Sequence, residues 1–269
     1  MPAEPGPPGI VCAGLAKRFD GPGVGLPAVA PLTLRFAAGE TTALVGPSGC
    51  GKSTLLRLIA GLETPSEGAV RIGTETPAEV RARAGLAVGF QDPSLLPWRT
   101  VRGNVALALK LARRRADPVA IDRLLALVGL DGFGDTRPGA LSGGMRQRAA
   151  IARCLVTRPE LLLLDEPFGA VDELTRRQLA HDLPGLWEAR GTTTLFVTHS
   201  VTEAVLIADR VIVLSPRPAT VVADIPVTLE RPRAEGVELT PAFADLAEAV
   251  SAALARGVAE SGPKGLAAQ

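Results

Sequence analysis

The residues with the clearest chemistry form one continuous stretch, Gly46-Pro47-Ser48-Gly49-Cys50-Gly51-Lys52-Ser53-Thr54. It matches the phosphate-binding pattern G-x-x-x-x-G-K-[ST] at every fixed position. Glycines let backbone N–H groups converge on phosphate oxygens, and the start of a helix adds partial positive charge. In such a loop we expect Lys52 to face the β- and γ-phosphates of a nucleotide and the Ser53 hydroxyl to bind Mg²⁺. A structural glycine-rich turn with a surface lysine is the alternative.

The segments on either side of this stretch have the form that phosphate binding requires. Thr41–Val45 is a short β-branched and apolar run, which predicts a buried strand. Ser53–Ala60 is rich in Leu and Ile, and Gly61 is placed to end a helix. A strand, a glycine-rich turn and a helix are the context that the pattern needs, so the structural turn is disfavoured.

Two acids follow a second apolar run, Leu161–Leu164. The run suits a strand buried on both faces of a parallel sheet. Carboxylates at the C-terminal end of such a strand lie where open α/β sheets bind ligands. Asp165 therefore suits Mg²⁺ coordination, and Glu166 suits a base that orients water for attack on a γ-phosphate. Solvated acids at a strand end are the alternative that this segment alone leaves open.

Two further sites could contact phosphate. Ser142-Gly143-Gly144 stands at the expected start of a helix, where an N-cap and bare backbone amides would form a second anion site. His199 directly follows an expected strand, Thr193–Thr198, and could donate to a γ-phosphate oxygen. Each also has a structural interpretation, as an ordinary capped helix and as a lone histidine.

The rest of the chain must supply the elements that position these residues. Short apolar runs between turns predict antiparallel strands from Ile10 to Glu40. Residues 92 to about 157 are expected to form an inserted helical lobe, with helices beginning after the N-caps Thr100 and Asp117. Residues 1–9 are expected to be disordered. Further strands and a terminal helix are expected at Gly68–Gly73, Leu86–Phe90, Val211–Leu214, Thr220–Ile225 and Pro241–Glu260.

The composition is that of a globular chain: 269 residues, 46% hydrophobic and 21% charged. A formal net charge of +1 argues against a large electrostatic surface for nucleic acid. No apolar run approaches the roughly 18 residues of a membrane span, so we expect contact with a membrane only through a partner. The three cysteines are odd in number and widely spaced, which fits a reducing cytoplasm and no metal or disulfide framework.

Taken together, residues 10–230 resemble the ATP-binding cassette (ABC) ATPases. Six sites occur in the family's order and at suitable distances: Gly46–Thr54, Gln91, Leu141–Gln147, Leu161–Glu166, Asp172 and His199. The resemblance implies an α/β P-loop ATPase core with an antiparallel β-lobe and an inserted helical lobe, binding ATP and Mg²⁺. It also implies that Glu166 is the catalytic glutamate, that Gln91 contacts Mg²⁺ and the water, and that His199 is the switch histidine.

The resemblance further implies a homodimer. In this family two ATP molecules lie between two head-to-tail subunits, and each site combines the phosphate loop of one chain with the signature of the other. Ser142-Gly143-Gly144 matches that signature, and Asp172 matches the D-loop aspartate. Phe19 replaces the frequent adenine-stacking Tyr, so it could stack on adenine or belong to the core; its position does not decide between them.

A narrower resemblance, to the ATPase subunits of nitrate/sulfonate/taurine-type bacterial importers, rests on Gln91–Val101, Phe168–Asp172 and Arg231-Pro232-Arg233. It implies membrane permease subunits as partners, a solute-binding protein as an indirect partner, and a place at the cytoplasmic face of the cell membrane. Residues 231–269 would then be a short tail with one helix. A soluble ABC protein acting on nucleic acid or the ribosome is the rival, which one cassette, no heptad run and near-neutral charge disfavour.

One apolar cluster stands where a loop would normally be polar: Leu95-Leu96-Pro97-Trp98, shortly after Gln91. Exposed clusters of this kind mark binding surfaces, and Trp is a frequent anchor. We expect it to receive a cytoplasmic helix of the permease. The alternative is that Trp98 packs inward as core of the helical lobe.

Overall fold

A six-stranded sheet carries most of the residues singled out above. The computed structural model describes residues 6–20, 25–169 and 171–260. In the sheet the strands run in the order β5-β6-β7-β3-β8-β9, and only β9 joins antiparallel to its neighbour. Their bounds are Leu86–Gly89 (β5), Leu161–Asp165 (β6), Thr193–Thr198 (β7), Thr41–Val45 (β3), Arg210–Leu214 (β8) and Val221–Pro226 (β9). Every residue of β3, β6 and β7 is buried, as expected of strands covered on both faces.

A smaller antiparallel sheet forms the second layer, in the order β2-β1-β4 (Leu26–Phe36, Ile10–Phe19 and Glu67–Ile72). The helix that follows the phosphate loop, α1 (Lys52–Ile59), packs between the two sheets and shares one apolar core with them. Leu55 and Ile59 of α1 are fully buried there. The expected antiparallel β-lobe is therefore confirmed, and it holds α1 from the side opposite the larger sheet.

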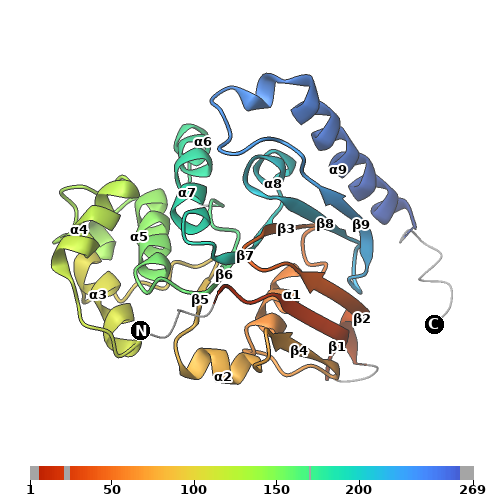
Figure 1. The fold of residues 1–269 in the computed structure, drawn as a ribbon, viewed down its shortest axis with the longest axis horizontal. Coiled ribbons are helices and arrows are strands. Elements are labelled where there is room, and N and C mark those ends of the chain that lie inside the picture. The colour runs from red at the N-terminus through yellow and green to blue at the C-terminus, as the bar shows by residue number, and fades with distance from the viewer. Residues whose placement is uncertain (1–5, 21–24, 170, 261–269) are drawn as a thin grey trace.

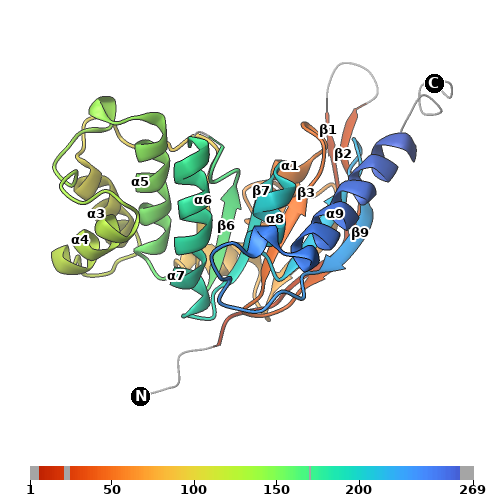
Figure 2. The same cartoon turned by 90° about the horizontal axis from the view of Figure 1, so that it is seen from above.

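The inserted helices form a lobe beside the β5 and β6 side of the sheet (Figures 1 and 2). They are α3 (Val101–Leu111), α4 (Pro118–Leu127) and α5 (Gly143–Leu155), with a short 3-10 turn, η1 (Pro138–Ala140). The three predicted N-caps are confirmed: the side chains of Thr100, Asp117 and Ser142 each accept a backbone N–H of the first helical turn.

The remaining helices cover the larger sheet: α6 (Glu173–Asp182), α7 (Pro184–Glu188), α8 (Val201–Ile207), the short η2 (Val237–Leu239) and α9 (Pro241–Glu260). The predicted terminal helix α9 is confirmed with its bounds, and it packs on β8, β9 and α8 at the end far from the helical lobe (Figure 2). None of the helices within the described residues is long and apolar enough to span a membrane.

Two features of the fold were not foreseen. A short helix, α2 (Pro77–Ala82), begins with a complete capping box between Thr76 and Glu79, a signal that the sequence carried and the analysis above did not use. Residues 1–5, for which disorder was expected, lie outside the described residues. Residues 6–9 are ordered, because the carbonyls of Pro8 and Gly9 accept hydrogen bonds from the Thr193 hydroxyl and from the backbone N–H of Gly73.

The two aromatic side chains that could have been core are both exposed. Trp98 is 68% exposed, so its packing inward as core of the helical lobe is wrong. Phe19 is exposed at the end of β1, so the core alternative fails for it too. The ammonium of Lys17 lies 4.8 Å from the centroid of the Phe19 ring.

Candidate nucleotide-binding site

The phosphate-binding loop joins β3 to α1 and requires glycine at Gly51. This residue has φ +120, and a Cβ there would lie 2.5 Å from the carbonyl oxygen of Ala28. Gly51 is also the N-cap of α1, and a glycine has no side chain that could accept a hydrogen bond from the first amides of the helix. The first amides of α1 are therefore left for a ligand, which is how such loops bind phosphate.

Lys52 and Ser53, the two functional residues predicted in the loop, both bond to other groups of the chain. Lys52 is only 5% exposed, and its ammonium donates to the carbonyls of Gly46 at 2.7 Å and Pro47 at 2.8 Å. The Ser53 hydroxyl donates to the Asp165 carboxylate at 2.9 Å, although 112 positions separate the two residues. Burial raises the pKa of Asp165, and the hydrogen bond from Ser53 partly offsets this.

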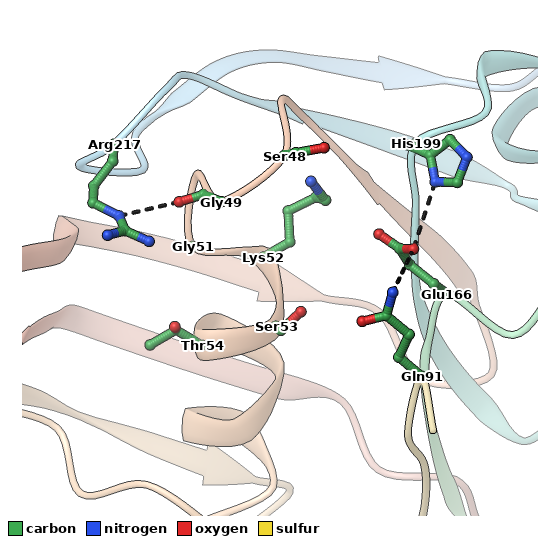
Figure 3. A pocket seen from close by; sticks show the side chains of 10 residues that line it. All are labelled: Ser48, Gly49, Gly51, Lys52, Ser53, Thr54, Gln91, Glu166, His199 and Arg217. Carbon is green, nitrogen blue, oxygen red and sulfur yellow. Dashed lines mark hydrogen bonds and ion pairs between the residues drawn. The ribbon is translucent and has the colours of Figure 1, made fainter. Parts of the chain in front are cut away.

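Three side chains from three neighbouring strands meet opposite Lys52 (Figure 3). Gln91 follows β5, Glu166 follows β6 and His199 follows β7. The amide of Gln91 donates to Glu166 Oε2 at 3.3 Å, and His199 Nδ1 lies 3.6 Å from the same oxygen. Because β5, β6 and β7 are adjacent and parallel, their C-terminal ends place these groups at one edge of the sheet.

The backbone of Glu166 is held in an unusual conformation. Its φ is +47, in the left-handed region, which costs a non-glycine residue on the order of 1 kcal/mol. The Glu166 N–H donates to the carbonyl of Val197 in β7 at 3.0 Å, which fixes the turn after β6. Strain of this kind gathers at functional sites, and here it presents the carboxylate to the cavity.

These groups surround one cavity of about 480 Å³. Its lining is polar and mixed in charge: Ser48, Gly49, Gly51, Lys52, Ser53, Thr54, Gln91, Glu166, His199 and Arg217. Arg217 was missed by the sequence analysis. It comes from the turn between β8 and β9, and its Nε donates to the Gly49 carbonyl at 3.0 Å (Figure 3). An arginine alone between two prolines forms no motif, so no sequence signal could have assigned it.

Three of the predicted site groups lie away from this cavity. Neither the Ser142-Gly143-Gly144 segment nor Asp172 nor Phe19 is among the described residues that line it. Ser142 is exposed and caps α5 by accepting from Met145 N at 3.2 Å. Asp172 caps α6 by accepting from the N–H of Thr175 at 3.0 Å, and this bond lowers the pKa of the Asp172 carboxyl.

The donor set suits Mg²⁺ bound together with a ligand. Within the described residues there is no cluster of three or more His, Cys, Asp or Glu side chains that could hold a metal by themselves. The Ser53 hydroxyl and the Asp165 carboxylate are a pair of hard oxygen donors in contact. Mg²⁺ in phosphate sites binds to one or two such groups and takes its other ligands from phosphates and water, so the residues present fit this ion.

Comparison with known proteins decides the family. The sequence profile described as "ABC transporter" matches residues 29–169. The chain belongs to the ABC transporter family. It is 47% identical over 237 residues to the "Aliphatic sulfonates import ATP-binding protein SsuB" of Cupriavidus necator, covering 88% of this chain and 74% of that protein.

Solved structures agree with this assignment. The "Dimeric Structure of MJ0796, a Bacterial ABC Transporter Cassette" is similar with a TM-score of 0.75 and 31% identity, over 82% of this chain and 100% of that one. A post-hydrolysis state of MJ0796 bound to ADP and Pi is similar with a TM-score of 0.74 and 28% identity, over the same shares. The P-loop ATPase fold is thus confirmed. This chain is an ATPase that binds and hydrolyses ATP.

Proposed function

We propose that this chain is the ATP-hydrolysing subunit of a bacterial importer that takes up a small solute through a separate membrane permease. The solute would be of the nitrate/sulfonate/taurine class, and the similarity to SsuB favours an aliphatic sulfonate. The observation that carries the proposal is that Lys52, Ser53 and Glu166 line one cavity and that Asp165 is bonded to Ser53.

Hydrolysis would use each of these groups in one role. Lys52 exchanges its bonds to the loop carbonyls for the β- and γ-phosphates, and the first amides of α1 bind the remaining phosphate oxygens. Glu166 orients a water for attack and accepts its proton, while Gln91 positions the same carboxylate through its hydrogen bond. His199 donates to a γ-phosphate oxygen. Most of this catalysis is positioning and electrostatic stabilisation.

Mg²⁺ would be held by Ser53 and Asp165, with Gln91 close to it. When bound, the ion neutralises charge on the β- and γ-phosphates. The raised pKa of Asp165 means that protons compete with the metal more strongly here than at an exposed aspartate. The Ser53 hydroxyl, which now donates to Asp165, would turn its lone pairs to the ion.

A second copy of the chain would complete the site. The amides at the start of α5, behind the exposed Ser142, do not line the chain's own cavity, and neither does Asp172. Both would face the nucleotide site of a partner in a head-to-tail homodimer, and the dimeric MJ0796 cassette supports this arrangement. Each ATP would then lie between the phosphate loop of one chain and Ser142-Gly143-Gly144 of the other.

The permease would dock on the segment Leu95-Leu96-Pro97-Trp98, which carries the exposed Trp98. Leu96 also lines an apolar hollow between β5 and α3, which would extend this docking surface. The hollow has a volume of about 540 Å³ and is lined, among others, by Val88, Leu96 and Leu111. The buried Asn104 fixes the position of Leu96, because the side-chain oxygen of Asn104 accepts a hydrogen bond from the N–H of Leu96 at 2.7 Å. A permease helix docked in the hollow would press on the segment that carries Gln91. Movement of the permease would in this way be coupled to the nucleotide bound at the site. The chain would lie at the cytoplasmic face of the cell membrane, and a solute-binding protein would act only through the permease.

Affinity purification tests this function. The tagged full chain, recovered from its source cells in mild detergent, should bring down a membrane permease. The complex in proteoliposomes should hydrolyse ATP faster when a solute-loaded binding protein is added, with aliphatic sulfonates, taurine and nitrate as the solutes tested. The Lys52→Ala chain should assemble but show no stimulation. Recovery of ribosomes or nucleic acid in place of a permease would refute the proposal.

A further inference from the structure

A buried acid next to the switch histidine has no role in the site described so far. Glu203 of α8 is only 8% exposed, and burial raises its pKa. Its Oε2 accepts a hydrogen bond from the Thr198 hydroxyl at 2.5 Å. Burying a carboxylate is costly unless it is paired, so its partners should explain why it is there.

Glu203 closes a small ring of bonds around the turn that carries His199. The N–H of Glu203 donates to the Ser200 hydroxyl at 3.2 Å, and the N–H of Ser200 donates to the Thr198 hydroxyl at 3.0 Å. With the bond from Thr198 to Glu203, these contacts join both residues that flank His199 to the first turn of α8. The ring therefore fixes the backbone from which the imidazole projects.

The charge that faces Glu203 comes from another helix. Arg176 of α6 places its Nε 3.6 Å from Glu203 Oε1. Another nitrogen of the same guanidinium donates to the carbonyl of Val171 at 3.0 Å, directly before Asp172. The Arg176 side chain thus touches both the segment of the D-loop aspartate and the acid behind His199.

The contact between Arg176 and Glu203 is loose in this structure. The Nε atom of Arg176 is buried, yet it makes no hydrogen bond within the part of the chain that the structure describes. At 3.6 Å the ion pair is longer than a hydrogen bond. A shift of α6 towards α8 by less than 1 Å would close it, which ties the position of the Asp172 segment to that of His199.

We propose that Arg176 and Glu203 are positioning residues for ATP hydrolysis: the pair links the segment of Asp172 to the turn that holds His199. Neither side chain lines the nucleotide cavity, so neither would touch ATP. The pair lets the Asp172 segment, once a second subunit contacts it, change the placement of the imidazole. The inference rests on the role proposed for His199. The experiment must therefore distinguish a failure of that role from a failure of the link between Arg176 and Glu203.

The histidine signals give a direct readout, because the chain has only two histidines. Glu203→Gln and Arg176→Gln are compared with the wild-type full chain by the Cε1–H NMR signals at one fixed pH. Both variants should move the signal of His199. His181 lies on α6 and pairs with Glu238 at 3.2 Å, so its signal shows whether that helix has moved as well.

Steady-state kinetics supply the second readout. Each single variant should lower kcat about tenfold and leave KM for ATP within about twofold, and the double variant should be no slower than either single one. Arg83→Gln is the matched control: it breaks ion pairs with Glu75 at 2.6 Å and Glu160 at 2.5 Å. None of these three residues lines the cavity, so kcat should stay unchanged.

Two results would overturn the link. One is a His199 signal that does not move in either variant. The other is a double variant whose loss of kcat is the product of the two single losses, since independent residues add their effects. If His199→Ala kept full turnover, the role proposed for His199 would fail, while the NMR comparison would still decide whether the pair positions the ring.

Discussion

The exposed indole of Trp98 allows a quantitative test of the permease surface. A fully buried Trp removes about 150–250 Å² from water. With 68% of the residue exposed, roughly 140 Å² remains for a partner to cover. At about 25 cal/mol per Å² this is worth at most about 3.5 kcal/mol of binding free energy. We expect Trp98→Ala to weaken permease assembly by about 2–3 kcal/mol, the range of an interface hot spot.

The same substitution should cost the isolated chain much less. The buried third of Trp98 corresponds to roughly 60 Å², or about 1.5 kcal/mol of unfolding free energy. The matched control is Trp187, which is 1% exposed and donates from its Nε1 to the Thr41 hydroxyl at 3.2 Å. Trp187→Ala should cost about 3–5 kcal/mol of the chain's own stability.

The assay measures both quantities for each variant. Urea unfolding of the isolated chain gives its stability, and titration of the variant against the purified permease gives assembly. We expect the two variants to rank in opposite order in the two assays. Trp98→Ala should weaken assembly with the permease more, and Trp187→Ala should lower the stability of the isolated chain more. The reasoning is refuted if Trp98→Ala binds the permease as tightly as the wild type, or if it loses as much stability as Trp187→Ala.

The nucleotide site gives four further predictions. Lys52→Ala should abolish tight ATP binding in calorimetry, because it removes the cation that we propose faces the phosphates; unchanged affinity would remove Lys52 from this role. Glu166→Gln should bind ATP but hydrolyse it about 10²–10⁴-fold more slowly and persist as an ATP-bound dimer in size-exclusion chromatography, so near-normal turnover would contradict it. Ser142→Arg should stop hydrolysis and spare ATP binding, and mixing it with Lys52→Ala should restore part of the activity; no recovery at any ratio would count against shared sites. Arg217→Ala should weaken ATP binding about tenfold in the same calorimetry, as expected of one charged contact, and equal affinity would show that Arg217 only supports the loop.

Local patterns in the sequence determined the parts of the site that depend on neighbours in the chain. The phosphate loop was predictable because glycine spacing, a β-branched run and a helix signal all fall within residues 41–61. The N-caps at Thr100, Asp117 and Ser142 were predictable because a cap binds an amide two or three residues away. The apolar run before Asp165 indicated a strand buried on both faces, and all of its residues are buried.

Only the tertiary structure decided which of these segments meet. Ser53 contacts Asp165 across 112 positions, and Gln91 contacts Glu166 across 75, because the strands stand in the order β5-β6-β7-β3. A sequence carries no local signal for strand order, which results from how the helices and sheets pack together. The same packing brought Arg217 to the phosphate loop and left Trp98 open to solvent. The sequence therefore predicted candidate reacting groups, and the order of the parallel strands brought them together, since adjacent strand ends place their side chains at one edge of a sheet.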